Sequence, residues 1–236
     1  MNIVDNTLED LKILEVAYNY SQWIFSQFAK YTGQRIVEMG SGIGNLTKHL
    51  LDKELVLAID NHASCVNTLK SKFSANSNIV TLSMDISNQN IVSLKKYLPD
   101  TIICVNVLEH IEDDVMTLKN MYEIMVGGGK LLLLVPALKP LYGKIDRFHN
   151  HYRRYSRVEL IDKLNKSGFK IIDSYYMNSI GIFGWVYDTI IFSRQEHTSE
   201  HVKFFDRFIV PWLSRFERLK RPPIGLSLIV IAEKRL

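Results

Sequence analysis

Three glycines at alternate positions follow a short apolar run that ends in an acid, in the stretch VEMGSGIGNLTKHLL. The acid is Glu38, and the glycines are Gly40, Gly42 and Gly44. Glycine has no Cβ atom, so the backbone can turn sharply here and a ligand can approach closely. A carboxylate beside the turn would repel a pyrophosphate but would attract an ammonium group. The pattern therefore predicts a binding site for a ligand that carries a positive charge.

Two phosphate-binding patterns fit this turn less well. A P-loop needs Lys and then Ser or Thr after its last glycine, whereas Asn45 and Leu46 follow Gly44. A dinucleotide fingerprint has the spacing G-x-G-x-x-G, and the third glycine of this chain comes one position too early. A nucleotide-dependent oxidoreductase of the NAD type stays open as an alternative that the spacing disfavours. A non-catalytic module that only binds the ligand is a second alternative.

Two further acids close the next two apolar runs. Asp60 ends ELVLAID and Asp85 ends NIVTLSMD. Open α/β sheets bind ligands at the carboxyl ends of their strands, where an acid after the second strand can accept hydrogen bonds from ribose hydroxyls. Asp85 can accept from an exocyclic amine, with Ile86 in apolar contact with the ring. S-adenosylmethionine has an amino group, a ribose and an adenine without a phosphate, and we predict it as the cofactor.

The glycine turn and these acids lie in motifs that resemble a known family. VEMGSGIGNLT, LAIDNH, LSMDI and VNVLEHIEDD resemble successive motifs of class I S-adenosylmethionine-dependent methyltransferases, over about Val37 to Val135. The chain looks most similar to the branch of ubiquinone/menaquinone-type small-molecule methyltransferases, and YNYSQW resembles a segment that lies over the cofactor there. The resemblance implies methyl transfer to a small-molecule or lipid-like acceptor. It also implies a cofactor site made of Tyr20, Trp23, Glu38, Gly40, Ser41, Gly42, Gly44, Asn45, Asp60, Asn61, Asp85, Ile86, Asn106 and Val107.

The elements that must position these residues follow from the hydrophobic pattern. Apolar runs alternate with helical patterns, which predicts a parallel sheet with helices on both faces. A helix is expected directly after the glycines, over GNLTKHLL, and Ser156 is expected to cap a later helix. With the resemblance, this predicts an α/β, Rossmann-like fold with a seven-stranded, mostly parallel sheet whose last strand is antiparallel. We expect one methyltransferase domain over residues 1–236, with a helical cap at 1–33, a cofactor-binding core at 34–136 and a substrate side at 137–236.

Side chains that act on the acceptor are expected in two loops. A base is needed only if the acceptor arrives protonated, and histidine titrates near neutral pH. His110 follows the fourth strand, and His151 lies in HNHYRRY after the fifth. An alternative is that HNHYRRY is only a structural loop, held by hydrogen bonds and ion pairs. The predicted catalytic residues are His110, His151 and Tyr142, and the predicted substrate-binding residues are His151, Arg153, Arg154 and Trp185.

Composition and charge restrict the partners. The net charge is +4 with dispersed basic residues, so no nucleic-acid partner is expected. Cys65 and Cys104 are read as reduced core thiols, and the lack of clustered ligands predicts no metal site. The start of the chain shows no secretory signal and no apolar run is long enough to span a membrane, so a cytoplasmic protein is expected.

The most apolar addition to the predicted core covers residues 180–219. It could form the wall of a hydrophobic pocket. Residues 200–220 could pack on their own domain, contact a second subunit or, as a basic amphipathic helix, lie on a membrane surface. The candidates for the wall are Phe183, Trp185, Tyr187, Ile190, Ile191 and Phe192.

Overall fold

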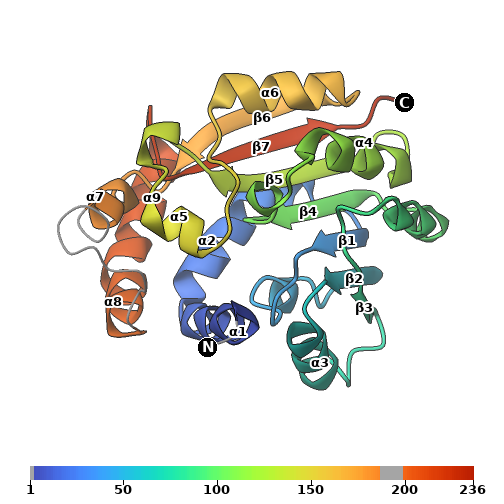
Figure 1. The fold of residues 1–236 in the computed structure, drawn as a ribbon, viewed down its shortest axis with the longest axis horizontal. Coiled ribbons are helices and arrows are strands. Elements are labelled where there is room, and N and C mark those ends of the chain that lie inside the picture. Colours follow the sequence, from blue (N-terminus) through green and yellow to red (C-terminus); the bar gives the residue numbers. More distant parts are fainter. Residues whose placement is uncertain (1–2, 187–198) are drawn as a thin grey trace.

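The computed structural model describes residues 3–186 and 199–236, and these contain one seven-stranded sheet (Figure 1). Of the expected pocket wall, Tyr187, Ile190, Ile191 and Phe192 lie outside the described residues. The strands are β1 (Arg35–Met39), β2 (Leu55–Asp60), β3 (Ile79–Ser83), β4 (Thr101–Val105), β5 (Lys130–Pro136), β6 (Lys170–Met177) and β7 (Ser227–Glu233). The α-helices are α1 (Ile3–Glu15), α2 (Tyr18–Phe28), α3 (Ala63–Lys72), α4 (Asp114–Ile124), α5 (Lys144–Phe148), α6 (Arg157–Lys166), α7 (Gly181–Val186), α8 (Ser199–Phe204) and α9 (Val210–Leu219).

The strand order is β3-β2-β1-β4-β5-β7-β6. Strands β1 to β5 pair in parallel, and β7 runs antiparallel to both β5 and β6. This confirms the predicted fold class. The order of the strands reverses between β1 and β4, and such a switch point is where open α/β sheets bind ligands.

The sheet is buried on both faces, which explains the continuous apolar runs of its strands. Successive side chains of a strand point to opposite faces. Val37 therefore belongs to the core cluster that contains Leu118 of α4, and Ile36 belongs to the cluster that contains Phe28 of α2. Helices α4 and α6 cover the first face, and α2 and α9 contribute to the core on the second.

The start of α2 is held by a residue from the far end of the chain. Ala17 precedes α2 and offers no side-chain cap. Asp206 replaces it, because its carboxylate accepts from the backbone N–H of Tyr20 at 2.7 Å and of Asn19 at 3.2 Å. A carboxylate at a helix N-terminus is favourable because the first N–H groups of the helix have no partner within it. Asp206 thereby anchors the N-terminal helices to the segment before α9.

One prediction about helices was wrong in detail, and another is confirmed. No α-helix follows the glycines, where the structure has only a 3-10 turn at Thr47–His49. The segment is short, because β2 begins at Leu55, and Asn and Thr are poor helix formers. Pro211 sits in the first turn of α9, where proline is tolerated. Ser156 caps α6 as predicted, accepting from the N–H of Glu159.

One irregular feature completes this part of the fold. A π-helical turn, Phe205–Ile209, joins α8 to α9. Within residues 3–186 and 199–236, no helix is both long and apolar enough to cross a bilayer.

Candidate functional site

The glycine turn begins where β1 ends and is attached to β2. The N–H groups of Gly40 and Ser41 both donate to the carbonyl of Ile59, at 2.9 and 2.8 Å. Gly40, Gly42 and Gly44 have φ values of +75°, +54° and +88°, a region that side chains with a Cβ atom rarely adopt. A Cβ on Gly40 would lie 2.2 Å from a methyl carbon of Val107, across the switch point. The glycines are therefore needed both for the turn and for the close approach of two strands.

Glu38 is buried at the base of this turn, with only 3 % of its surface exposed. Its Oε2 atom accepts from the Thr47 hydroxyl at 2.6 Å. Burial, with a smaller contribution from the charge of Asp60, raises the pKa of Glu38 to about 7, against the effect of the Thr47 hydrogen bond. A carboxylate that is this poorly solvated gains strongly from a cation placed beside it.

Asp60 ends β2 and organises the loop that faces it. One carboxylate oxygen accepts from the Gly42 N–H and the other from the His62 N–H, both at 2.9 Å. Each oxygen has a second lone pair available for a ligand. Asp60 therefore links the glycine turn to the segment that follows β2.

Asp85 differs from the other two acids because it is exposed and engaged locally. Its Oδ1 atom accepts from the N–H and the hydroxyl of Ser87, at 2.9 and 2.7 Å. Ile86, the next residue, is buried and lines the same cavity as Asp85. After β4, Asn106 adopts a positive φ of 52°, which places Asn106 and Val107 at the rim beside Gly40.

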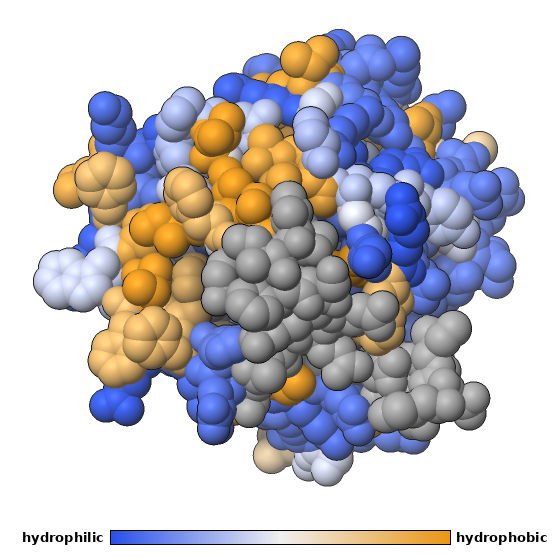
Figure 2. Space-filling model, turned by 60° about the vertical axis from the view of Figure 1, so that its left-hand side comes forward, coloured by the Kyte–Doolittle hydropathy of each residue, from blue (hydrophilic) through white to orange (hydrophobic). Residues whose placement is uncertain are grey.

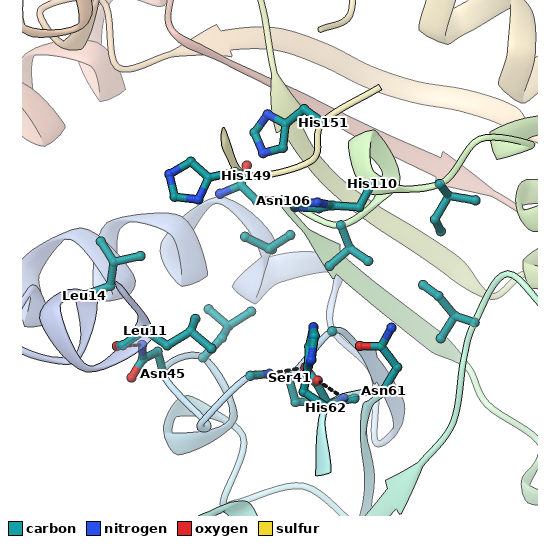
Figure 3. A pocket seen from close by; sticks show the side chains of 18 of the residues that line it. Leu11, Leu14, Ser41, Asn45, Asn61, His62, Asn106, His110, His149 and His151 are labelled. Atoms are coloured by element: carbon teal, nitrogen blue, oxygen red, sulfur yellow. Dashed lines mark hydrogen bonds between the residues drawn. The ribbon is translucent and has the colours of Figure 1, made fainter. Parts of the chain in front are cut away.

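A cavity of about 860 Å³ joins these elements at the switch point. Figure 3 shows His110, His149 and His151 gathered at one end of it and Asn61 and His62 at the other. Of the predicted site, the residues that line this cavity are Tyr20, Glu38, Gly40, Ser41, Gly42, Asn45, Asp60, Asn61, Asp85, Ile86, Asn106, Val107, His110, Tyr142 and His151.

The histidine end is built by the loop around α5. Asp146 is fully buried and accepts from Arg154 Nε at 2.8 Å and from the Gly143 N–H at 2.9 Å. The Asp146 Oδ1 atom, which accepts from Arg154, also lies 3.0 Å from His151 Nδ1. The rings of His151 and His110 meet edge to face, with centroids 4.6 Å apart. The Tyr142 hydroxyl donates to the carbonyl of His151 at 2.8 Å, so this loop is held in one arrangement.

Five predicted residues lie outside the cavity lining. Gly44 faces Phe73, and Trp23 is buried in the core below Tyr20. Arg153 pairs with Asp114 at 2.9 Å, and Arg154 pairs with Asp146. The Arg154 guanidinium also stacks on the Trp185 ring at 4.1 Å. The cationic side chain that does border the cavity is Arg147 of α5.

Other residues that line the cavity were not predicted from the sequence. Leu11 and Leu14 of α1 cover one side of the cavity (Figure 3), but their three-residue spacing is the same as that of core positions. His62 and Met84 follow strands, and no motif separates them from ordinary loop residues.

One group at the histidine end could hold a metal ion, although the sequence predicted none. Ligand atoms of Glu109, His110 and His151 lie within 4.8 Å of one another. Burial raises the pKa of Glu109 to about 8, and the charge of Arg154 opposes this shift. Sequence spacing gave no sign of this group, because its members come from two distant loops.

Solved structures share this fold at low sequence identity. One is a complex between the Haloferax volcanii Trm112 methyltransferase activator and a protein described as a methyltransferase (TM-score 0.65, 13 % identity, 98 % of this chain and 94 % of that one). Another is an S-adenosylmethionine-dependent methyltransferase from Mesorhizobium loti (TM-score 0.57, 16 % identity, 89 % and 95 % covered). A third is Haemonchus contortus phosphoethanolamine N-methyltransferase 2 in complex with S-adenosyl-L-methionine (TM-score 0.59, 16 % identity, 92 % and 53 % covered).

The family of the chain follows from its sequence rather than from these structures. No curated protein matches the chain in sequence. A family model described as a methyltransferase domain matches residues 15–174, which is more than half of the chain. This match decides against the oxidoreductase alternative. The chain belongs to the methyltransferase-domain family and is an S-adenosylmethionine-dependent methyltransferase.

Proposed function

We propose that the chain transfers the methyl group of S-adenosylmethionine to a small, lipid-like acceptor that binds at the histidine end of the cavity. The observation that carries this proposal is that one cavity connects the acidic rim, which consists of Glu38, Asp60 and Asp85, with His110 and His151. Its volume of about 860 Å³ is near the upper end of the roughly 300–1,000 Å³ typical of ligand pockets. That size supports an acceptor bound beside the cofactor.

The cofactor fits the acidic rim by charge and shape. The buried carboxylate of Glu38 suits the ammonium group, and the free lone pairs of Asp60 suit the ribose hydroxyls. Ile86 supplies an apolar surface for the adenine ring beside Asp85. The left-handed turn at Gly40 and Gly42 leaves their backbone open to the cavity, which supports close approach of the methionine part.

The chain itself has to position the acceptor, exclude water and act on a proton. S-adenosylmethionine supplies a methyl group on a sulfonium, which is already activated for transfer. A protonated acceptor needs its proton removed, and this is worth roughly 10²–10⁴ in rate. We assign this role to His110, His151 and Tyr142, which border the cavity. Asp146 fixes the loop that carries Tyr142 and His151. Arg147, which lies over the Tyr142 ring at 5.6 Å, is placed to bind an acidic group of the acceptor.

An exposed apolar stripe supports a lipid-like acceptor. The stripe consists of Phe204, Phe208, Trp212, Phe216 and Leu219, whose side chains are between 53 % and 88 % exposed. Figure 2 shows apolar side chains gathered on the face of the molecule where α7, α8 and α9 lie. Helix α8 contacts α1, whose Leu11 and Leu14 line the cavity.

The charges around the stripe favour a membrane surface over a second subunit. Between residues 201 and 220, the exposed charged side chains are all Lys or Arg, because the two acids, Asp206 and Glu217, are buried. An apolar stripe flanked by basic residues suits the surface of an anionic membrane. Two copies of this face would bring like charges together. We also propose that the chain belongs to the branch similar to ubiquinone/menaquinone-type enzymes, a proposal that rests on the resemblance of its sequence motifs, such as VEMGSGIGNLT and VNVLEHIEDD.

The test is to incubate the purified protein with methyl-labelled S-adenosylmethionine and either a lipid extract or an aqueous metabolite extract. We expect the label in one small molecule of the lipid extract, identified by mass spectrometry. His151→Ala should lower this labelling at least tenfold, whereas His201→Ala, on exposed α8, should not. Label found only in protein or nucleic acid would contradict the proposed acceptor class.

A further inference from the structure

We propose that Glu109, His110 and His151 bind one divalent transition-metal ion at the acceptor end of the cavity. Two histidines and one carboxylate are a common ligand set for zinc and for other first-row metals that keep open positions. His110 and His151 line the cavity, while Glu109 lies beneath them, fully buried. The three residues therefore surround a point that opens toward the acceptor.

The buried carboxylate of Glu109 is the observation that points to a ligand. Neither of its oxygens has a hydrogen-bond partner among the described residues. Leaving a charged group buried without a partner is costly, and such groups are normally paired or bound to metal. Arg154 is the neighbouring cation, but its guanidinium donates to Asp146 and to the carbonyl of Ala137. The oxygens of Glu109 are therefore open to a ligand.

His151 already has the second interaction that metal-binding histidines need. Its Nδ1 atom lies 3.0 Å from Asp146, which leaves Nε2 for a metal ion. Histidine ligands usually donate their other ring N–H to a carboxylate, which orients the ring and strengthens the ligand. Asp146 is itself fixed by Arg154 and Gly143, so the orientation of His151 is set by the fold.

The distances allow a metal after a small movement. The three ligand atoms lie within 4.8 Å of one another, whereas tetrahedral ligands about 2.1 Å from zinc lie roughly 3.4 Å apart. The His110 side chain is exposed to the cavity, so its ring has room to rotate toward Glu109 while the Asp146 contact holds His151 in place.

A metal ion at this site would define the class of acceptor more closely, and this inference rests on the proposed function. Three protein ligands leave a position open to the cavity, where water or an oxygen of the acceptor can bind. A metal lowers the pKa of an oxygen bound to it. His110 and His151 would then act on the acceptor's proton through the metal, and the acceptor class would be one that carries a hydroxyl group.

The test uses the whole protein, stripped with a chelator and titrated with Co²⁺, whose visible absorption reports bound nitrogen and oxygen ligands. We expect one Co²⁺ per chain, displaced by one equivalent of Zn²⁺. Glu109→Gln and His151→Ala should each weaken binding at least 100-fold. Asp146→Asn should weaken it about 10- to 100-fold, because it removes the carboxylate that orients His151. His62→Ala, which removes another cavity histidine, should bind Co²⁺ like the unaltered protein.

Thermal unfolding separates loss of binding from loss of folding. Zn²⁺ should raise the melting temperature of the unaltered protein and of His62→Ala, but not that of Glu109→Gln. If Glu109→Gln does not fold, His110→Asn takes its place with the same expectation. Absence of the Co²⁺ absorption, or equal affinity in the altered and unaltered proteins, would overturn the site. Calorimetry with S-adenosylmethionine on the same stripped protein tests the proposed function separately, because cofactor binding without metal binding removes only the metal site.

Discussion

We expect Glu38 to bind the ligand at a cost to the stability of the fold. It is buried beside Asp60, and its pKa of about 7 means that the folded protein holds its proton more tightly than the unfolded chain does. Below pH 4.5 both states are protonated and folding carries no penalty from this group. The free energy of unfolding then falls as pH rises from about 4.5 to 7, by up to roughly 3 kcal/mol. An ammonium group next to Glu38 would recover part of this loss.

Replacing Glu38 therefore has opposite effects on stability and on binding. We expect Glu38→Gln to match the unaltered protein in stability at pH 4.5 and to exceed it at pH 8 by about 1–3 kcal/mol, measured by urea unfolding. Its affinity for S-adenosylmethionine should fall at least tenfold in calorimetry at pH 8. Glu54→Gln, at a largely exposed acid, is the control and should change neither quantity by much. A stability difference that does not change with pH would contradict the assignment.

Asp60 is predicted to serve the ligand and the loop together. Its two oxygens hold the N–H groups of Gly42 and His62, so Asp60→Ala should loosen the turn and remove the partner of the ribose. Hydrogen bonds to a charged group contribute about 1.5–3 kcal/mol, so we expect cofactor affinity to fall about 10- to 100-fold. Asp52→Ala, at a largely exposed acid after the same loop, is the matched control. Equal affinity in the two variants would remove Asp60 from the site.

At the scale of the elements, α1 covers one side of the cavity without belonging to the sheet. Its contact with the glycine turn consists of a hydrogen bond from Asn45 Nδ2 to the carbonyl of Leu11 at 3.0 Å and of Leu11 packed above Gly42. Lys72 of α3 pairs with Glu15 at 2.6 Å and holds the end of α1. These few contacts make the position of α1 sensitive to the shape of the turn.

A side chain at Gly42 should therefore disturb both the turn and the helix above it. A Cβ there would lie 3.0 Å from Leu11, and a β-branched residue is strained at a φ of +54°. We expect Gly42→Val to weaken cofactor binding at least tenfold while the far-ultraviolet circular dichroism stays the same. Gly184→Val is the control, because a Cβ at Gly184 meets no atom within 4 Å. Full affinity in Gly42→Val would show that the cofactor does not approach this glycine.

At the scale of the whole molecule, the apolar stripe and the cavity lie in connected parts of the fold. Asp206 anchors the segment before α9 to α2, and α8 contacts α1. Binding of the stripe to a membrane would therefore place the covered side of the cavity near the lipid surface. A lipid-like acceptor could then reach the site without crossing water.

This arrangement predicts binding to anionic vesicles. We expect the protein to sediment with phosphatidylglycerol vesicles but not with phosphatidylcholine vesicles, and to be released by salt, since each basic residue near the surface adds about 1 kcal/mol. Trp212→Glu together with Phe216→Glu should abolish binding. Val158→Glu, at an apolar residue of α6 that is 81 % exposed, should not affect it. A dimer in sedimentation analysis that this double substitution converts to monomer would instead identify the stripe as a subunit interface.

The sequence by itself determined the sheet and the acidic rim. Strands that are buried on both faces must be apolar throughout, and a turn with positive φ needs glycine, so both features appear in the order of residues along the chain. Glu38, Asp60 and Asn106 could be placed at the rim because each lies at or next to the carboxyl end of a strand. The prediction of a helix after Gly44 was wrong, because the segment before β2 is short and contains poor helix formers.

The tertiary structure alone decided how charges and ligands from distant segments pair. HNHYRRY offers several cations and histidines of similar type, and only packing shows that Arg153 and Arg154 pair with buried acids while His151 faces the cavity. The group of Glu109, His110 and His151 likewise depends on where two loops meet above β4 and β5. Such pairings depend on distances of a few ångströms between residues far apart in the chain, and residue spacing in a sequence does not encode those distances.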